Sequence, residues 1–190
     1  VRDAMSTINE VDAALAEVKK VTGASDSQLA SIQANAYSVG SKYGASATDY
    51  TNAVVEFTRA GYKEQAEALA ELSIQTQIAG NLSAEIANQF LLATDASYQL
   101  GGSVEDLTGA LDSGVYIANN YATSVEKIAE GVGLVAPVAK QAGLSIVEME
   151  AAIGTITAVT QESGNTAARA LRSLMLNIAK DTKTEVEDGV

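Results

Sequence analysis

Three glutamates in the second half of the sequence carry side chains that could perform acid–base chemistry. Glu148, Glu150 and Glu162 could pair as a general acid and a general base. Glu148, however, is explained by its place in a helix cap, and the other two fall on the polar side of an apolar helical stripe. We therefore expect no catalytic residue, and we predict that the chain is not an enzyme.

The patterns that bind metals and cofactors are also missing from the sequence. There is no Cys and no His, which excludes thiolate chemistry and ordinary zinc sites. The acidic ending with Glu185, Glu187 and Asp188 lacks the ligand spacing of a calcium loop. The GVG run at 131–133 follows no strand and lacks the Lys of a phosphate-binding loop. We expect neither a metal site nor a cofactor.

Charge and hydropathy exclude two further classes of protein. The net charge of −12 argues against specific nucleic-acid binding, because phosphate contacts need clustered Lys and Arg. The longest apolar run, 131–139, is much shorter than the roughly 20 residues that cross a bilayer, so we expect no membrane span. The first residues, VRDAMSTINE, are polar and charged, which is unlike a signal peptide.

The element that would position any side chain is an α-helix with a repeated start signal. A Gly ends one helix in the left-handed conformation, and a following Ser or Thr accepts a hydrogen bond from the first free N–H groups of the next. The predicted N-caps are Ser25, Ser46, Ser103, Thr123 and Ser145. Each is followed three residues later by an acidic residue or Gln, which predicts capping boxes with Gln28, Asp49, Asp106, Glu126 and Glu148.

Apolar residues recur at spacings of three and four between these starts, and the starts repeat about every twenty residues. The pattern predicts an all-α fold, a multi-helix array of antiparallel helical hairpins with helices of about 15–20 residues. The sequence identity between the repeated units is confined to the caps, which is weaker than in a true repeat array. We expect three regions, namely 1–22 as a longer, coiled-coil-like N-terminal helix, 23–180 as the helical core region, and 181–190 as an acidic tail or a continuation of the last helix.

The N-terminal helix has the spacing of a coiled-coil seam. Ile8, Val11, Leu15 and Val18 alternate steps of three and four and predict a self-association seam, so we expect a homo-oligomer. An ordinary amphipathic helix that packs on the next helix explains the same stripe equally well.

One stretch of the sequence contains helix-breaking residues. Pro137 follows Gly131 and Gly133 within a single helical period, which predicts a kink or a break there. Such a point could act as a hinge or simply connect two helices. Among the tyrosines, Tyr43 and Tyr50 fall on the stripes, and we expect them to pack between the helices.

The order of these phrases resembles a known family. The run YATSVEKIAEGVGLVAPVAKQAGLSIVEMEAAIGTITAVTQESGNTAARALRSLMLNI, residues 121–178, is similar to the core region of phage tail tape measure proteins. The runs AGYKEQAEALAE and LLATDASYQLGGSVEDLTGALD resemble the same core, so the likeness covers about residues 40–180. The family often has a second Gly shortly before the Leu171–Arg172 pair, where this chain has Ala168.

The resemblance implies a structural virion protein of a phage or prophage-derived tail. Such a protein lies in the lumen of the tail tube, sets tail length as the tape measure and is released at genome ejection. Its implied partners are tail tube proteins, tail tip or baseplate proteins, and tail assembly chaperones, and its assembly takes place in the host cytoplasm. The alternative is a non-catalytic helical interaction module, such as a chaperone-like or signalling bundle, that binds partner helices.

Overall fold

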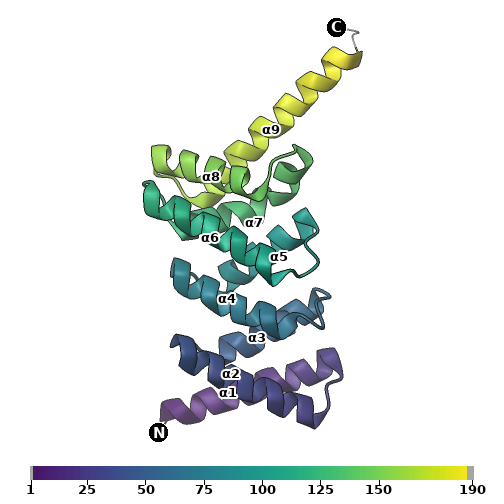
Figure 1. Ribbon diagram of the computed structural model, residues 1–190, viewed down its shortest axis with the longest axis vertical. Coiled ribbons are helices and arrows are strands. Elements are labelled where there is room, and N and C mark those ends of the chain that lie inside the picture. The colour runs from purple at the N-terminus through teal and green to yellow at the C-terminus, as the bar shows by residue number, and fades with distance from the viewer. Residues whose placement is uncertain (1, 188–190) are drawn as a thin grey trace. The chain divides into compact units, whose positions relative to one another are not determined.

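The computed structural model describes the backbone of residues 2–187 and the side chains of residues 9–180. Within this part the chain contains α-helices and no strands, which confirms the predicted all-α fold (Figure 1). The helices are α1 (Arg2–Thr22), α2 (Asp26–Tyr43), α3 (Ala47–Arg59), α4 (Ala66–Gly80), α5 (Ala84–Tyr98), α6 (Val104–Asn120), α7 (Val125–Gln141), α8 (Ile146–Thr160) and α9 (Gly164–Glu187).

The contacts divide the chain into two compact units, and the division falls within α5. Unit 1 is Val1–Asn88 and unit 2 is Gln89–Val190, whereas the boundaries predicted from the sequence lie at residues 22 and 180. The helix α1 is packed against α2 and α3 and thus forms part of unit 1. The last helix reaches Glu187, so a large part of the range 181–190 continues α9.

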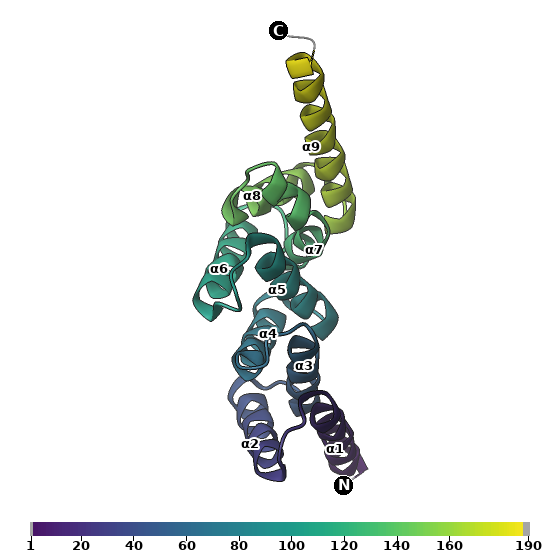
Figure 2. The ribbon, with the colours of Figure 1, turned by 90° about the vertical axis from the view of Figure 1, so that its right-hand side faces the viewer.

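The helices of each unit follow the same order of contacts. In unit 1, each helix from α1 to α4 packs on the next helix and on the next but one, and α6 to α9 repeat this order in unit 2. Figures 1 and 2 show the successive helices of each unit folding back on one another. This order is characteristic of stacked helical repeats, in which every contact is between near neighbours in the sequence. The two units therefore share an arrangement of helices, although the sequence identity between the repeated segments is confined to the caps.

Each unit encloses its own core. In unit 1, Tyr50 and Phe57 of α3 are buried together with Leu69 and Leu72 of α4, which bears out the packing role expected for Tyr50. The largest fully buried apolar side chains described in unit 2 are Leu91, Leu107, Ile128, Met149 and Ile153. In the described part of the chain, no helix combines the length and the apolar character needed to cross a membrane.

Candidate functional site

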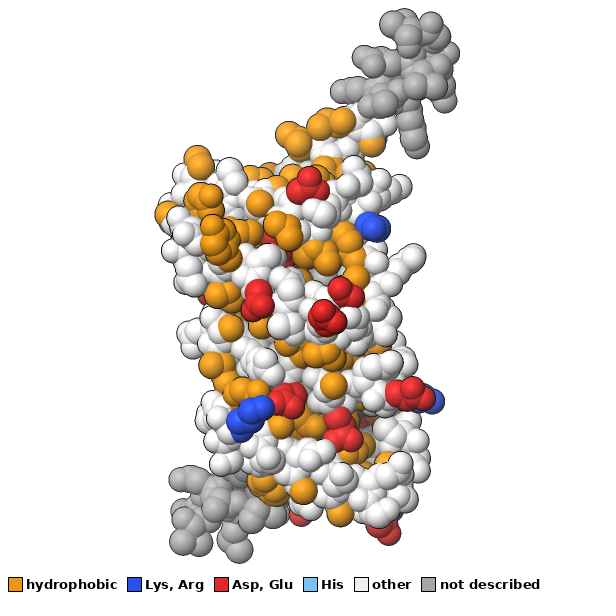
Figure 3. Space-filling model, in the orientation of Figure 1, with side chains coloured by type: hydrophobic (Ala, Val, Ile, Leu, Met, Phe, Trp, Pro, Cys, Tyr) orange, Lys and Arg blue, Asp and Glu red, His pale blue; other side chains and the backbone are white. Residues whose placement is uncertain are grey.

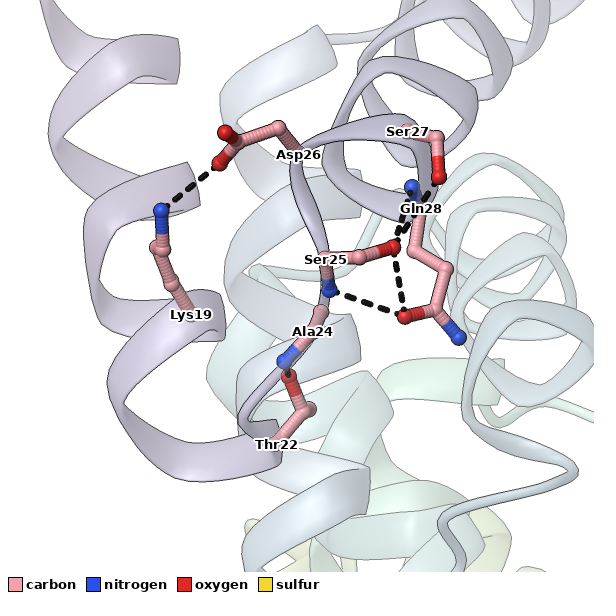
Figure 4. A network of polar contacts seen from close by, with 7 residues as sticks. All are labelled: Lys19, Thr22, Ala24, Ser25, Asp26, Ser27 and Gln28. Atoms are coloured by element: carbon pink, nitrogen blue, oxygen red, sulfur yellow. Dashed lines mark hydrogen bonds and ion pairs between the residues drawn. The ribbon is translucent and has the colours of Figure 1, made fainter.

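The helix starts are the structural signals that the sequence repeats most often, and Figure 4 shows one of them in detail. The Ser25 hydroxyl accepts a hydrogen bond from the Gln28 N–H (3.3 Å), and the Gln28 side-chain oxygen accepts one from the Ser25 N–H (2.9 Å). In the connection before it, the Ala24 N–H donates to the Thr22 hydroxyl (2.9 Å). Lys19 of α1 also forms an ion pair with Asp26 of α2 (2.7 Å), so side chains on both sides hold this turn.

The predicted caps at Ser46, Ser103 and Ser145 also occupy N-cap positions, but the predicted boxes are present only in part. The reciprocal bond occurs at Ser145 with Glu148, as it does at Ser25. At Ser46 and Ser103, the described bonds run one way, from the N–H of the third helical residue to the Ser hydroxyl. The residues there are Asp49 and Asp106, whose side chains are one methylene shorter than those of Glu and Gln. The prediction of full boxes at these two starts was wrong.

The cap predicted at Thr123 lies one residue too early. The N-cap of α7 is Ser124, whose hydroxyl accepts a hydrogen bond from the Lys127 N–H (3.2 Å). The Thr123 hydroxyl instead shares a hydrogen bond with the Thr157 hydroxyl of α8 (2.6 Å). Neighbouring Thr and Ser residues both have side chains that can cap a helix. Here Ser124 caps α7 while the Thr123 hydroxyl is bonded to α8.

No break occurs at the predicted kink, because α7 runs without interruption through Gly131, Gly133 and Pro137. The predicted kink within the continuous helix stays a prediction. The two glycines instead lie where other groups approach α7 closely. A Cβ atom at Gly131 would be 2.7 Å from the Ile153 Cγ2 atom of α8, and one at Gly133 would be 3.1 Å from the Gln89 side chain. Both glycines are therefore packing positions.

The same kind of contact recurs between the other helices of unit 2. A Cβ atom at Gly154 of α8 would be 2.6 Å from the Ile117 Cγ2 atom of α6. At Gly114 of α6, it would be 3.7 Å from the Ile128 Cγ2 atom of α7. An isoleucine of one helix thus rests on a glycine of its neighbour, and the missing Cβ allows the two backbones to approach closely.

The glutamates that could have formed a catalytic pair have different environments. Glu148 is exposed, and hydrogen bonds from the Ser145 N–H and hydroxyl lower its pKa from 4.5. Glu150, expected on the polar side of α8, is fully buried, with a relative exposure of 0%. The Ser113 hydroxyl of α6 donates to its Oε2 atom, and burial raises its pKa to about 8. Their roles in a cap and in the interior give no support to joint acid–base chemistry.

The described members of the predicted self-association seam are packed inside unit 1. Val11, Leu15 and Val18 are buried, and α1 lies against α2 and α3. The side chain of Ile8 lies outside the described residues. An ion pair between Arg59 of α3 and Glu17 also joins α3 to α1. This packing accounts for the apolar stripe within one chain, while the predicted self-association stays a prediction.

A polar cleft of about 280 Å³ opens between α2, α3 and α4 of unit 1. Lys42 and Glu71 form an ion pair across it (2.8 Å), which raises the pKa of Lys42 and lowers that of Glu71. The Asn35 amide donates to Glu67 (2.7 Å), as does the Tyr50 hydroxyl (3.3 Å). The charged side chains of Lys42, Glu67 and Glu71 that line the cleft are thus bonded to other residues of the cleft. In the part of the chain that the structure describes, no cluster of His, Cys, Asp and Glu is suited to hold a metal ion.

Comparisons with known proteins agree on the family. The family model described as phage-related minor tail protein matches residues 31–189. A tape measure protein of Pneumococcus phage Dp-1 is 30% identical over 186 residues, which make up 94% of this chain and 15% of that protein. The chain therefore spans a small part of the length of this relative. No solved structure matches the chain.

The matched region includes most of both units, from within α2 to beyond the end of α9. The all-helical hairpin array agrees with a structural component of a phage tail, and so with a place in the virion. The chain belongs to the phage-related minor tail protein family.

Proposed function

We propose that this chain is a segment of a tape measure protein that lies in the lumen of the phage tail tube, sets tail length and leaves ahead of the DNA at genome ejection. The observation that carries the proposal is the 30% identity to the Dp-1 tape measure protein over 94% of the chain. Its proposed partners are the tail tube proteins, the tail tip or baseplate proteins and the tail assembly chaperones. Association with further copies of the chain is part of the same proposal.

The helical character of the chain suits a ruler. A continuous α-helix advances about 1.5 Å per residue, so its length follows from the number of residues. In the hairpin array each helix folds back on its neighbour, so the same residues cover less distance (Figure 2). The proposal therefore requires the segment to be extended while it measures.

The surface charge suits passage of DNA through the same lumen. On the face drawn in Figure 3, acidic side chains are scattered among hydrophobic ones, and basic side chains are sparse. The chain as a whole contains 12 Lys and Arg against 24 Asp and Glu. A net negative charge of this size repels the phosphate backbone and so opposes binding of the segment to DNA.

Chemical labelling of virions tests the place in the lumen and the release. The chain contains no Cys, so a phage that carries Val159→Cys, at a strongly exposed position of α8, gains one thiol in this segment. We expect a maleimide too large to enter the tail to leave this thiol unlabelled in intact virions and to label it after ejection. Wild-type phage controls for cysteines elsewhere in the protein, and the purified variant chain shows that the thiol is reactive. Labelling in intact virions, or absence of the segment from virions, would contradict the proposal.

A further inference from the structure

Glu150 is a buried carboxyl group that forms no ion pair with any of the side chains that the structure describes. Its side chain is fully buried between α8 and α6, and Ser113 of α6 contacts its Oε2 atom. Its Oε1 atom has no hydrogen-bond partner among the described residues. An ionised carboxylate in such a place would lose its hydration without gaining an equivalent set of donors.

Ser113 is the single described hydrogen-bond partner of Glu150, and its hydrogen bond lowers the pKa of Glu150 by less than burial raises it. The Ser113 Oγ atom lies within hydrogen-bond reach of two acceptors, the Ala110 carbonyl oxygen (3.0 Å) and Glu150. A hydroxyl has one hydrogen and can donate fully to one of them. If Glu150 is protonated, its own O–H donates to Ser113 while Ser113 donates to Ala110, and both contacts are satisfied.

Among the described residues, no basic side chain forms a hydrogen bond or ion pair with Glu150. A Cβ atom at Gly114 would be 3.9 Å from Glu150 Oε1 and 3.7 Å from the Ile128 side chain, so this side of the site is apolar. Tyr98 of α5 interacts electrostatically with Glu150 but carries no positive charge, and its hydroxyl donates to the Leu144 carbonyl oxygen (3.0 Å). None of the other titratable groups described on α6 to α9 forms a described bond with Glu150. They are Glu105, Asp106, Asp112 and Tyr116 of α6, Glu126, Lys127, Glu130 and Lys140 of α7, Glu148 of α8, and Arg169, Arg172 and Lys180 of α9.

Unit 1 shows how a buried polar group is held when it has partners. The Asn88 amide nitrogen donates to Glu56 of α3 (2.5 Å), and its amide oxygen accepts a hydrogen bond from Ser73 of α4 (2.5 Å). Both functions of the Asn88 side chain are thus satisfied. Glu150 differs because one of its oxygen atoms is left without a donor in the described structure.

We propose that unit 2 folds with Glu150 protonated and that loss of this proton opens the contact between α6 and α8, so that the order of unit 2 is controlled by pH. The contact at stake includes the close approach of Ile117 in α6 to Gly154 in α8. An ionised Glu150 can become hydrated only if the two helices separate. This device goes beyond the proposed measuring function and does not depend on it.

The direction of the effect follows from the two states of the group. Burial raises the pKa of Glu150 from 4.5 to about 8 in the folded chain. Between these pH values the folded state holds a proton that the unfolded state has released. The stabilisation is therefore complete below the unfolded pKa and is lost as the pH rises through the folded pKa. Within this window, one linked proton changes the folding equilibrium constant by about tenfold per pH unit.

Urea unfolding of the full chain at pH 5 to 9, followed by NMR signals of α6 and α8, tests this linkage. For the wild-type chain, we expect the folding equilibrium constant of unit 2 to fall by about tenfold per pH unit between about pH 5.5 and 7.5. Glu150→Gln keeps the shape of the neutral side chain and should remove this dependence. Glu148→Gln, two residues away on the exposed side of α8, should retain it. An equal dependence in the wild-type chain and in Glu150→Gln would overturn the proposal.

A direct titration keeps the proposal testable if Glu150→Gln does not fold. The side-chain carboxyl carbon of Glu150 in the wild-type chain can be followed by ¹³C NMR as the pH is raised. We expect a midpoint close to 8, or unfolding of unit 2 coupled to the titration. A midpoint near 4.5 in folded unit 2 would show that the buried group is ionised at neutral pH and would overturn the proposal.

Discussion

Gly164, the first residue of α9, lies directly against the backbone of Lys127 in α7. A Cβ atom at position 164 would be 1.8 Å from the Lys127 carbonyl oxygen and 2.7 Å from the carbonyl carbon. Backbone atoms inside a helix cannot turn aside as a side chain can. The absence of a side chain at position 164 therefore allows α9 to begin in direct contact with α7.

Gly164→Ala should destabilise unit 2 by about 3 kcal/mol or more, because α9 must move away from α7. Gly109→Ala is the matched control, since Gly109 lies within α6 and a Cβ atom there would meet nothing within 4 Å. At this open helical position, Ala should stabilise the chain by about 0.5–1 kcal/mol. Urea unfolding measures both changes in the free energy of unfolding. If Gly164→Ala stabilised the chain as Gly109→Ala does, the close contact between α9 and α7 would not contribute to stability.

Ser145→Ala should cost about 1 kcal/mol of stability at neutral pH, because the start of α8 loses its side-chain acceptor. The bonds from Ser145 lower the pKa of Glu148 from 4.5. The contribution of Glu148 is therefore present above about pH 4.5 and is lost as the pH falls through its folded pKa. The cost of Ser145→Ala should shrink in acid, while that of Ser103→Ala, at a one-way cap, should change less. Thermal unfolding at several pH values tests this, and an equal acid response of the two variants would argue against the reciprocal bond.

Val18→Asp should destabilise unit 1, because Val18 is fully buried and α1 packs on α3. The structure explains this effect within one chain, so the loss of stability caused by Val18→Asp should be the same at all protein concentrations. Lys20→Asp is a matched control that places the same side chain at an exposed position of α1. A midpoint that rises with concentration, and that Val18→Asp makes independent of concentration, would instead favour the predicted self-association seam.

The helix starts could be predicted because a cap and its N–H donor lie within three residues of each other. The boxes at Ser25 and Ser145 depend on local geometry alone. The choice of Ser124 over Thr123 was missed because Thr123 is bonded to Thr157 in another helix. Local signals therefore predict where the helices lie, but a helix can begin one residue away from the predicted cap, as α7 does.

The burial of Glu150 could be recognised only from the packing around α8. Glu150, Ile153 and Thr157 share one helical face at spacings of three and four, and all three are buried. The stripe used for the prediction runs through Met149 and Ile153, and it leaves Glu150 just outside. Because α6, α7 and α9 all contact α8, the buried face is wider than the stripe of a helix with a single neighbour.

The structural role of a glycine inside a helix could not be predicted from the sequence. A Gly is compatible with a helix end, with a break or with a close contact between helices. Gly143 has a positive φ of 84° just beyond α7, as predicted for a helix end. Gly131 and Gly154 lie within helices, and an isoleucine side chain of a neighbouring helix packs closely against each of them. Only the three-dimensional structure shows these contacts.

Tail length in phages with an altered segment tests the central claim, the measuring function, most directly. The segment from Ser103 to Ala122 contains α6 and the start of its connection to α7, about twenty residues in all. An in-frame deletion should shorten the tail by roughly 30 Å, and a tandem duplication should lengthen it by the same amount, at about 1.5 Å per residue of extended helix. A phage in which a helical sequence of equal length replaces the segment is the control for the loss of its contacts, and its tails should keep the normal length. Electron micrographs that show tails of unaltered length in both the deletion and the duplication phage, with normal infectivity, would contradict the claim.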